Sequence, residues 1–226
     1  MAKTVTIAID GPAGAGKSTI ARKLAAELGY YYVDTGAIYR TVAYFLDLLG
    51  ISPKDLDGVS RYIDELTVAI EYDEDGLQHM IMNGMDVTND IRTPEISQKA
   101  SLVSAHAIVR DMLLDMQRDV AKQYNVIMDG RDIGTVVLPK ATVKIFLTAS
   151  PEVRARRRTD ELLAKGQKAN FDKVLAEIKQ RDYQDTHREV APLKMSRDSI
   201  KLDTSDMDID GVIAAMKEII AKKVGA

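Results

Sequence analysis

A glycine-rich segment near the start of the sequence carries the residues best suited to chemistry, Gly11-Pro12-Ala13-Gly14-Ala15-Gly16-Lys17-Ser18-Thr19. Glycine adopts backbone angles that are closed to other residues, so successive N–H groups can turn inward around phosphate oxygens. Lys17 supplies a flexible cation for the β- and γ-phosphates of ATP, and the Ser18 hydroxyl suits Mg²⁺, a hard ion that prefers oxygen ligands. Thr19 can contact a further phosphate. The pattern predicts a P-loop that binds ATP through residues 11–19.

The segments on either side of this loop support the prediction. Val5 to Ile9 is a short β-branched run that predicts a strand, and Ile20, Leu24 and Leu28 lie four residues apart, as on one face of a helix. A glycine-rich turn that only caps a helix is the structural alternative, but such a turn would not require every fixed position of the motif. A P-loop alone does not separate kinases from ATPases and GTPases, so residues that bind a phosphate acceptor must decide.

Further polar residues gather in three places along the chain. Asp34 to Arg40 and Asp129 to Thr135 each follow an apolar run that predicts a strand. The carboxyl ends of parallel strands are where ligands bind in open α/β folds. Arg181, Asp185 and Arg188 are spaced by four and then three residues, which places all three on one face of a helix. We expect this face to point into a cleft.

Strands alternate with helices along most of the chain, which predicts a parallel sheet covered on both faces. The expected strands of this sheet span 5–9, 30–33, 126–128, 143–147 and 200–202. The expected helices follow the P-loop and span 38–49, 94–123 in one or two pieces, 151–165, 171–188 and a closing segment from 212 onward. Thr67 to Tyr72 and His79 to Met82 look like two strands joined by a turn at 73–76, which predicts a small β-rich insertion.

Composition narrows the class of protein further. The 226 residues are 46% hydrophobic and 29% charged, as in an ordinary globular chain, and the absence of cysteine excludes disulfides, cysteine-ligated zinc and thiol nucleophiles. The formal net charge of −3 argues against electrostatic binding to a nucleic-acid polymer. The first residues lack the pattern of a signal peptide, and no apolar run approaches membrane-spanning length. We therefore expect a cytoplasmic protein without a membrane partner, and we expect a monomer.

Taken together, the three polar segments, the P-loop and the β-rich insertion resemble bacterial cytidylate kinases over nearly the whole chain. The resemblance implies a P-loop three-layer α/β/α fold with a central parallel sheet, a small β-rich insertion and a helical lid. It implies a core of residues 1–55, 95–150 and 189–226, an acceptor-side insertion of 56–94, and a lid with the following acceptor-binding helix at 151–188. The implied reaction is phosphorylation of CMP or dCMP by ATP with Mg²⁺.

The resemblance also assigns residues to the parts of the acceptor. Arg40, Arg131 and Arg188 are the implied phosphate ligands, since a planar guanidinium can hold phosphate oxygens bidentately. Asp185 is expected to bind the ribose hydroxyls with Arg181 alongside. Thr35 stands where members of the family often have serine, and either hydroxyl can serve. Without the resemblance, Arg181 and Asp185 would be an ordinary exposed helix pair.

For the base, the resemblance points to Ser101, Arg110 and Asp132. Cytosine presents an exocyclic amine that an aspartate can accept, beside ring N3 and O2 acceptors to which an arginine can donate. Uracil inverts this edge, and a buried polar mismatch is costly, so a preference for cytosine is expected. Taken alone, Ser101 would be a helix-surface serine, Arg110 a solvated charge and Asp132 a cap for the following turn.

The arginine run at 154–158, followed by Gly166, resembles the mobile lid of nucleoside monophosphate kinases, although such a run is usually a solvated helix face. Closure of a lid would neutralise the transferred group and expel water. We expect direct in-line transfer with Lys17, Arg131, Arg157 and Arg188 as catalytic groups. Asp129 is expected to hold Mg²⁺ through water. A phosphate oxygen is already a competent nucleophile, so no general base is required.

The alternatives are a kinase for another small acceptor, such as UMP, AMP, shikimate or dephospho-coenzyme A, and a P-loop switch ATPase. The β-rich insertion and the base-recognition residues argue against the other kinases. The sequence has no evident guanine-binding Asn-Lys-x-Asp segment, and its arginines suit a second small anion better than a macromolecule. An inactive chain that retains the fold is the third alternative.

Overall fold

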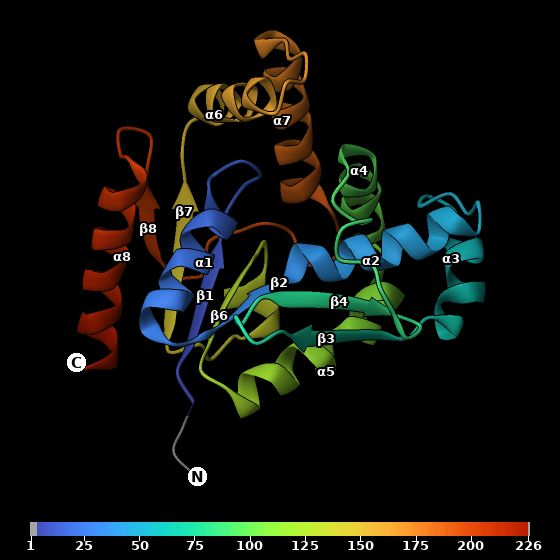
Figure 1. Cartoon of the computed structure of the whole chain (residues 1–226), viewed down its shortest axis with the longest axis horizontal. Helices are drawn as coiled ribbons and strands as arrows, with labels where there is room; N and C mark the ends of the chain where they lie inside the picture. The colour runs from blue at the N-terminus through green and yellow to red at the C-terminus, as the bar shows by residue number, and fades with distance from the viewer. Residues whose placement is uncertain (1–3, 226) are drawn as a thin grey trace.

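The computed structural model describes residues 4–225. Within that range the central sheet has the order β2-β6-β1-β7-β8, and every neighbouring pair of strands is parallel (Figure 1). Its strands are β1 (Thr6–Asp10), β2 (Tyr31–Asp34), β6 (Val126–Gly130), β7 (Val143–Thr148) and β8 (Ile200–Asp203). The strands β1, β6 and β7 are apolar and almost wholly buried, as a parallel sheet covered on both faces requires. Each predicted strand is confirmed within one or two residues at its ends.

The two faces of the sheet belong to different hydrophobic clusters, because side chains along a strand alternate between its faces. Ile7 and Ile9 of β1 pack against α1 (Lys17–Leu28) and α8 (Ile209–Val224). Ala8 lies in the opposite cluster, which includes residues of α2 (Thr35–Leu48), α4 (Pro94–Val103) and α5 (Ala107–Gln123). The three-layer α/β/α arrangement predicted from the sequence is therefore confirmed.

The β-rich insertion is confirmed as an antiparallel sheet of β3 (Val68–Tyr72), β4 (Gln78–Met82) and the short β5 (Met85–Asp86). Its turn depends on Gly76, whose φ is 72°, and on the Asp73 carboxylate, which accepts hydrogen bonds from two backbone amides of the turn. A helix that the sequence analysis did not predict, α3 (Leu56–Tyr62), precedes this sheet and runs into a 3-10 turn at Ile63–Glu65. Met80 and Met82 share one core with Ala8, so the insertion packs onto the body of the protein.

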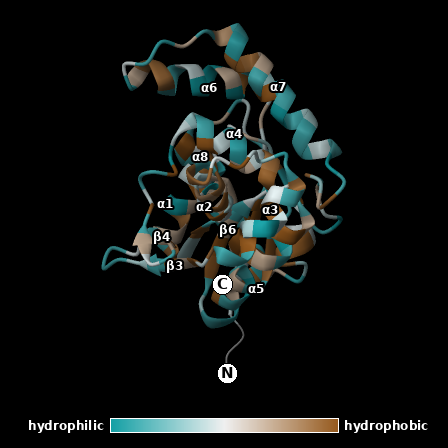
Figure 2. Cartoon of the chain, turned by 90° about the vertical axis from the view of Figure 1, so that its right-hand side faces the viewer, coloured by the Kyte–Doolittle hydropathy of each residue, from teal (hydrophilic) through white to brown (hydrophobic). Residues whose placement is uncertain are grey.

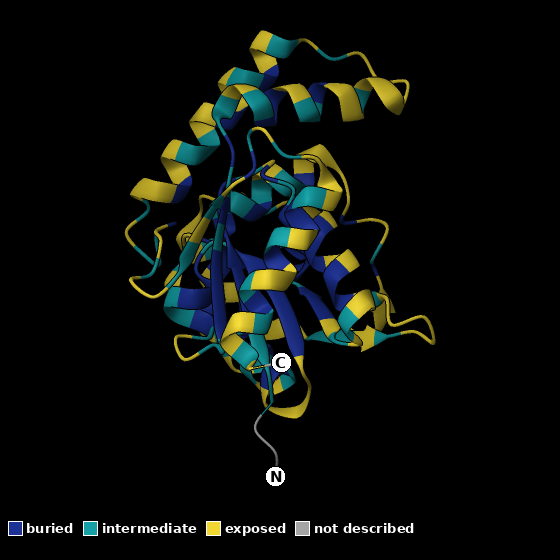
Figure 3. Ribbon diagram, turned by 90° about the vertical axis from the view of Figure 1, so that its left-hand side faces the viewer, coloured by how far each residue is buried: buried dark blue, intermediate teal, exposed yellow. Residues whose placement is uncertain are grey.

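Two helices that pack against each other, α6 (Pro151–Ala164) and α7 (Phe171–His187), stand apart from the sheet, as Figure 2 shows. They share a small core of their own, formed by Ala155, Val174 and Ile178. Figure 3 shows that most of their other residues are exposed or half-buried, in contrast to the buried strands. Within residues 4–225, no helix combines the length and the apolar character needed to cross a membrane.

Candidate active site

The P-loop joins β1 to α1 and depends on three glycines with positive φ. Gly11 has φ 154°, and a Cβ at this position would lie 1.9 Å from the carbonyl oxygen of Leu147 on β7. Gly14 and Gly16 have φ angles of 74° and 84°. At Gly11, only glycine tolerates the combination of this backbone angle with the close approach to Leu147. The loop ends where α1 begins at Lys17, so the first N–H groups of the helix are directed at any bound phosphate.

Lys17 is folded back across its own loop. Its Nζ donates a hydrogen bond of 2.8 Å to the carbonyl oxygen of Pro12, and the residue is almost completely buried. Burial, reinforced by the nearby positive charge of Arg131, lowers the pKa of Lys17 to about 7. The neighbouring carbonyl of Ala13 accepts a hydrogen bond of 2.9 Å from Nη1 of Arg154, which reaches the loop from α6. Two cations thus surround the place where phosphate oxygens would lie.

Asp129, near the end of β6, forms the oxygen-rich side of the site. Its carboxylate accepts hydrogen bonds from Ser18 Oγ at 3.0 Å and from the Tyr32 hydroxyl at 2.7 Å, and its backbone carbonyl accepts from Thr35 Oγ1 at 2.7 Å. Burial raises the pKa of Asp129, and the carboxylate of Asp34 raises it further. A carboxylate beside a hydroxyl is a donor set that Mg²⁺ prefers, so Ser18 and Asp129 fit the expected ion. Tyr32 was not identified from the sequence.

The arginines expected to bind the acceptor phosphate are each held by a carboxylate. Arg131 donates from Nε to Asp185 at 2.7 Å, and Arg40 donates to Asp34 at 2.8 Å. Arg181 lies near Arg131, and burial together with the charge of Arg131 lowers the pKa of Arg181 to about 10. Its Nε is buried and has no hydrogen-bond partner among residues 4–225. These cations form the centre of the candidate acceptor site.

Arg188, expected among the phosphate ligands, contacts residues expected to recognise the base, and its charge also acts on Asp185. It donates to Asp132 at 3.2 Å and to Ser104 Oγ at 3.0 Å. Arg110 pairs with the second carboxylate oxygen of Asp132 and donates to the Ser104 carbonyl at 3.3 Å. Burial raises the pKa of Asp132, while the two guanidinium groups oppose that rise. Ser104 is a further polar member of this cluster that the sequence analysis missed.

Ser101, expected to contact the base, bonds to the carboxylate that also binds Arg131. Its hydroxyl donates to Asp185 Oδ1 at 3.4 Å, and Asp185 in turn accepts from Arg131. The side chain of Asp185 is 5% exposed, so this part of α7 points inward, whereas Arg188 lies just beyond the end of the helix, where the backbone is extended. The structure therefore brings the acceptor residues from α2, α4, α5, α7 and the end of β6 to one region.

The four arginines of α6 contact different partners. Arg154 is buried, bonds Asp182 through both terminal nitrogens at 3.0 and 2.6 Å, and reaches the P-loop. Arg157, the residue favoured from the sequence, donates to the carbonyl of Thr204 at 2.6 Å and therefore lies against the segment between β8 and α8. Arg156 covers the ring of Phe171 at 4.6 Å, and Arg158 pairs with Glu161 at 2.7 Å. In this conformation Arg157 is not among the groups gathered at the P-loop.

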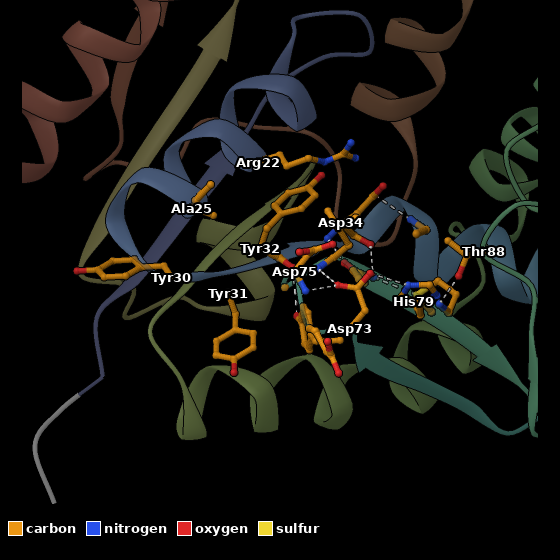
Figure 4. Close-up of a pocket in the computed structure, with 18 of the residues that line it drawn as sticks. Arg22, Ala25, Tyr30, Tyr31, Tyr32, Asp34, Asp73, Asp75, His79 and Thr88 are labelled. Carbon is orange, nitrogen blue, oxygen red and sulfur yellow. Dashed lines mark hydrogen bonds and ion pairs between the residues drawn. The ribbon is translucent and has the colours of Figure 1, made fainter.

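A groove of about 760 Å³ lies beside the site, between the end of α1, β2 and the β3–β4 turn (Figure 4). Its rim includes Asp34, Asp73 and Asp75, and His79 is held between Asp73 at 3.3 Å and Asp86 at 2.7 Å. Arg22 and Arg92 also line the groove, but the four carboxylates of Asp34, Asp73, Glu74 and Asp75 outnumber them and disfavour a phosphate there. The region around Arg131 and Arg181, and not this groove, therefore suits an anionic acceptor.

A parallel α/β sheet with a P-loop facing a cluster of buried arginines defines the class of P-loop kinases. The family model described as cytidylate kinase matches residues 7–222. A cytidylate kinase of an Exiguobacterium species is 47% identical over 97% of this chain and 98% of its own length. A cytidylate kinase of Carboxydothermus hydrogenoformans is 48% identical over 96% of this chain and 97% of its own. The chain belongs to the cytidylate kinase family, and it is a phosphotransferase.

A solved structure shows the likeness of fold alone. The crystal structure of an uncharacterized protein from Eubacterium ventriosum superposes with a TM-score of 0.52 at 14% identity, covering 97% of this chain and 99% of that one. The family membership decides against the switch ATPase considered from the sequence.

Proposed function

We propose that the protein transfers the γ-phosphoryl group of ATP to CMP or dCMP, forming ADP and CDP or dCDP. The observation that carries the proposal is the buried cluster of Arg110, Asp132 and Arg188, which adjoins an arginine-rich centre beside the P-loop. The membership in the cytidylate kinase family supports the same acceptor.

The base-recognition cluster is suited to cytosine. The Asp132 carboxylate can accept from the exocyclic amine, while Arg110 can donate to N3 and O2. Uracil would direct a carbonyl at Asp132 and an N–H at Arg110, and both groups are too buried for water to relieve the mismatch. We propose that Arg188 supports this cluster through Asp132, and that Ser101 contributes from its side.

Arg40, Arg131 and Arg188 are the proposed ligands of the acceptor phosphate. Asp185 is the proposed partner of the ribose hydroxyls, and Arg181, near both Arg131 and Asp185, can donate to either group of the acceptor. Thr35 remains a candidate phosphate contact, although its hydroxyl hydrogen is directed at the Asp129 carbonyl and would have to rotate away. None of these proposed contacts requires the 2′-hydroxyl specifically, so dCMP is expected to be a substrate. Use by Asp185 of both ribose hydroxyls would create a preference for CMP.

Transfer is proposed to be direct and in line. The P-loop amides and Lys17 hold the triphosphate, and Arg131 and Arg181 hold the acceptor oxygen that attacks the γ-phosphorus, so charge is stabilised where it spreads in the transition state. Ser18, and Asp129 through water, would hold Mg²⁺, which supplies positive charge to the phosphate oxygens when bound. No covalent intermediate and no general base are required, so the histidines need no catalytic role.

Residues 151–188 are proposed to act as a lid with the acceptor-binding helix, beside a core of 1–55, 95–150 and 189–226 and the insertion of 56–94. The separation of α6 and α7 from the sheet and their small independent core support this division. Arg154 already contacts the P-loop, whereas a role for Arg157 at the phosphates would require it to leave the Thr204 carbonyl. Closure would exclude water that could otherwise hydrolyse ATP.

A coupled assay of ADP formation tests the proposed function. ATP and Mg²⁺ are supplied with CMP, dCMP, UMP, AMP or GMP separately, and with no acceptor as control. Strong preference for CMP and dCMP is the expected result. Equal turnover of all acceptors, or the same turnover without any, would contradict the proposal.

The variant Asp132→Ala is expected to weaken discrimination between CMP and UMP, and unchanged selectivity would sink the assignment of the base-recognition residues. The proposed setting is the cytoplasm, in pyrimidine nucleotide supply, and the proposed state is a monomer. Sedimentation of the purified protein tests the latter.

A further inference from the structure

Asp10 is a buried carboxylate to which the proposed mechanism assigns no role. It is the last residue of β1 and directly precedes Gly11 of the P-loop. The residue is 3% exposed. Its Oδ1 accepts a hydrogen bond of 2.7 Å from the backbone N–H of Ile133, and its Oδ2 accepts one of 2.7 Å from the N–H of Gly134. Both partners come from a segment more than 120 residues further along the chain.

These two amides open a single turn of π-helix over Ile133–Val137 that begins immediately after Arg131 and Asp132. The carbonyl of Asp132 accepts the N–H of Val136 at 2.8 Å, so the turn pairs its later amides within itself. The first amides of any helix lack such partners and need an external acceptor. The Asp10 carboxylate fills that need for both, with two charge-assisted bonds that are stronger than neutral ones.

We infer that Asp10 is a positioning residue for acceptor selectivity, because its carboxylate fixes the backbone that carries Arg131 and Asp132 to the strand that carries the P-loop. The inference rests on the proposed function, in which Arg131 binds the acceptor phosphate and Asp132 recognises the base. The carboxylate touches neither substrate. It sets the position of the base-recognition carboxylate relative to the phosphates of ATP.

The surroundings of Asp10 suit this fixed role. The negative charge of Asp132 and the positive charge of Lys17 both act on it, and burial raises the pKa of Asp10 to about 6. The aliphatic stem of Lys144 closes the other side, since a Cβ at Gly134 would lie 3.1 Å from Lys144 Cδ and 3.2 Å from Asp10 Oδ2. Near neutral pH the ionised carboxylate can accept both amides, whereas an amide side chain can accept with one atom only.

Two variants test the inference from opposite sides of the contact. Asp10→Asn keeps the shape but directs an NH₂ group at one of the two amides. Gly134→Ala leaves Asp10 unchanged and presses a methyl group against its Oδ2 and against the flexible stem of Lys144. We expect each to lower kcat/KM for CMP, by roughly 10- to 100-fold for Asp10→Asn, since a buried hydrogen bond to a charge is lost. The loss for UMP should be smaller, so the preference for CMP narrows.

The matched control is Asp55→Asn, which alters a carboxylate that caps α3 through the Gly58 amide at 3.0 Å, away from the site. This control is expected to keep the wild-type ratio of CMP to UMP turnover. Binding of a non-hydrolysable ATP analogue should change less than threefold in all variants. Equal losses for CMP and UMP, or a loss confined to binding of the ATP analogue, would overturn the inference. If Asp10→Asn does not fold, the selectivity of Gly134→Ala alone decides.

Hydrogen exchange separates this inference from the proposed function. The amides of Ile133 and Gly134 should exchange faster in Asp10→Asn than in the wild type, whichever acceptor the enzyme uses. A wild-type enzyme without preference for CMP would refute the proposed function while leaving this exchange test intact. Unchanged exchange at both amides would refute the role of Asp10 itself.

Discussion

Replacement of Asp132 by alanine offers a sharp test of the site, because two arginines share this one carboxylate. The side chains of Arg110, Arg188 and Asp132 are 7%, 7% and 6% exposed. Removal of the carboxylate leaves two buried guanidinium groups of like charge without the one carboxylate that both contact, and only the more distant charge of Asp185 still acts on Arg188. The carbonyl and hydroxyl of Ser104 still accept hydrogen bonds, but they supply no negative charge.

The expected loss of stability follows from burial. Removing one partner of a buried ion pair typically lowers the free energy of unfolding by about 3–5 kcal/mol. For a chain of 150–250 residues, each kcal/mol shifts Tm by roughly 2–4 °C, so Asp132→Ala should lower Tm by about 6–20 °C. The isosteric Asp132→Asn should account for most of this loss, since the missing charge and not the missing volume is responsible.

Thermal unfolding followed by circular dichroism at neutral pH measures these shifts. The matched control is Asp119→Ala, which breaks an exposed pair with Lys122 at 2.7 Å whose side chains are 71% and 55% exposed. Exposed pairs contribute about 0–1 kcal/mol, so the control should barely move Tm. If Asp132→Ala lowers Tm no more than this control, the arginines do not depend on a buried carboxylate and the reasoning fails.

Three further predictions concern the P-loop and the insertion. Lys17→Ala should reduce ADP formation with CMP by about 10²–10³-fold or more, because a cation at the transferred group is lost; activity within tenfold of the wild type would contradict this role. Gly11→Ala should lower the free energy of unfolding by about 3–5 kcal/mol, since the methyl group overlaps the Leu147 carbonyl, whereas Gly50→Ala, at φ 67° in open space, should lose only about 1–2 kcal/mol in urea titrations. The carboxylates of Asp86 and Asp73 raise the pKa of His79, so its charged form stabilises the fold below the ordinary histidine pKa, and this contribution disappears as pH rises through the raised value. The Tm difference between wild type and His79→Gln should therefore be larger at pH 5.5 than at pH 9, and equal differences would refute the pairing.

Hydrophobic period and glycine placement predicted the body of the fold because both act locally. The β-branched run before the P-loop predicted a strand, and in the structure Ile7 and Ile9 lie in one core cluster and Ala8 in the other. The helix α2 was expected from Ile38 but begins at Thr35, because the Asp34 carboxylate caps it through the Ala37 amide at 2.9 Å. That cap was visible in the sequence as an aspartate three residues before a helical run.

Other elements depend on contacts that sequence spacing does not contain. The helix α3 is short, contains Gly58, and packs only Val59 fully inside, so its apolar pattern was too weak to predict. The spacing of Arg154 and Arg157 also could not decide between them, because residues three apart share a helix face. The packing of α6 sends one to the P-loop and the other to the β8–α8 segment. The role of Asp10 could not be predicted from the sequence, because its hydrogen-bond partners, Ile133 and Gly134, lie more than 120 residues further along the chain.

Carboxylates neutralise most of the buried arginines of the proposed acceptor site when no phosphate is bound. Arg40 and Arg131 pair with Asp34 and Asp185, so burying them does not leave bare charge. Arg181 has no carboxylate partner of this kind among residues 4–225, and its buried Nε, like that of Arg40, has no acceptor there. With its pKa lowered to about 10 it is still charged at neutral pH, so it can receive a phosphate oxygen without taking up a proton. A phosphate would satisfy this atom and reduce the repulsion between Arg131 and Arg181, which supports the proposal that this centre binds a second anion beside ATP.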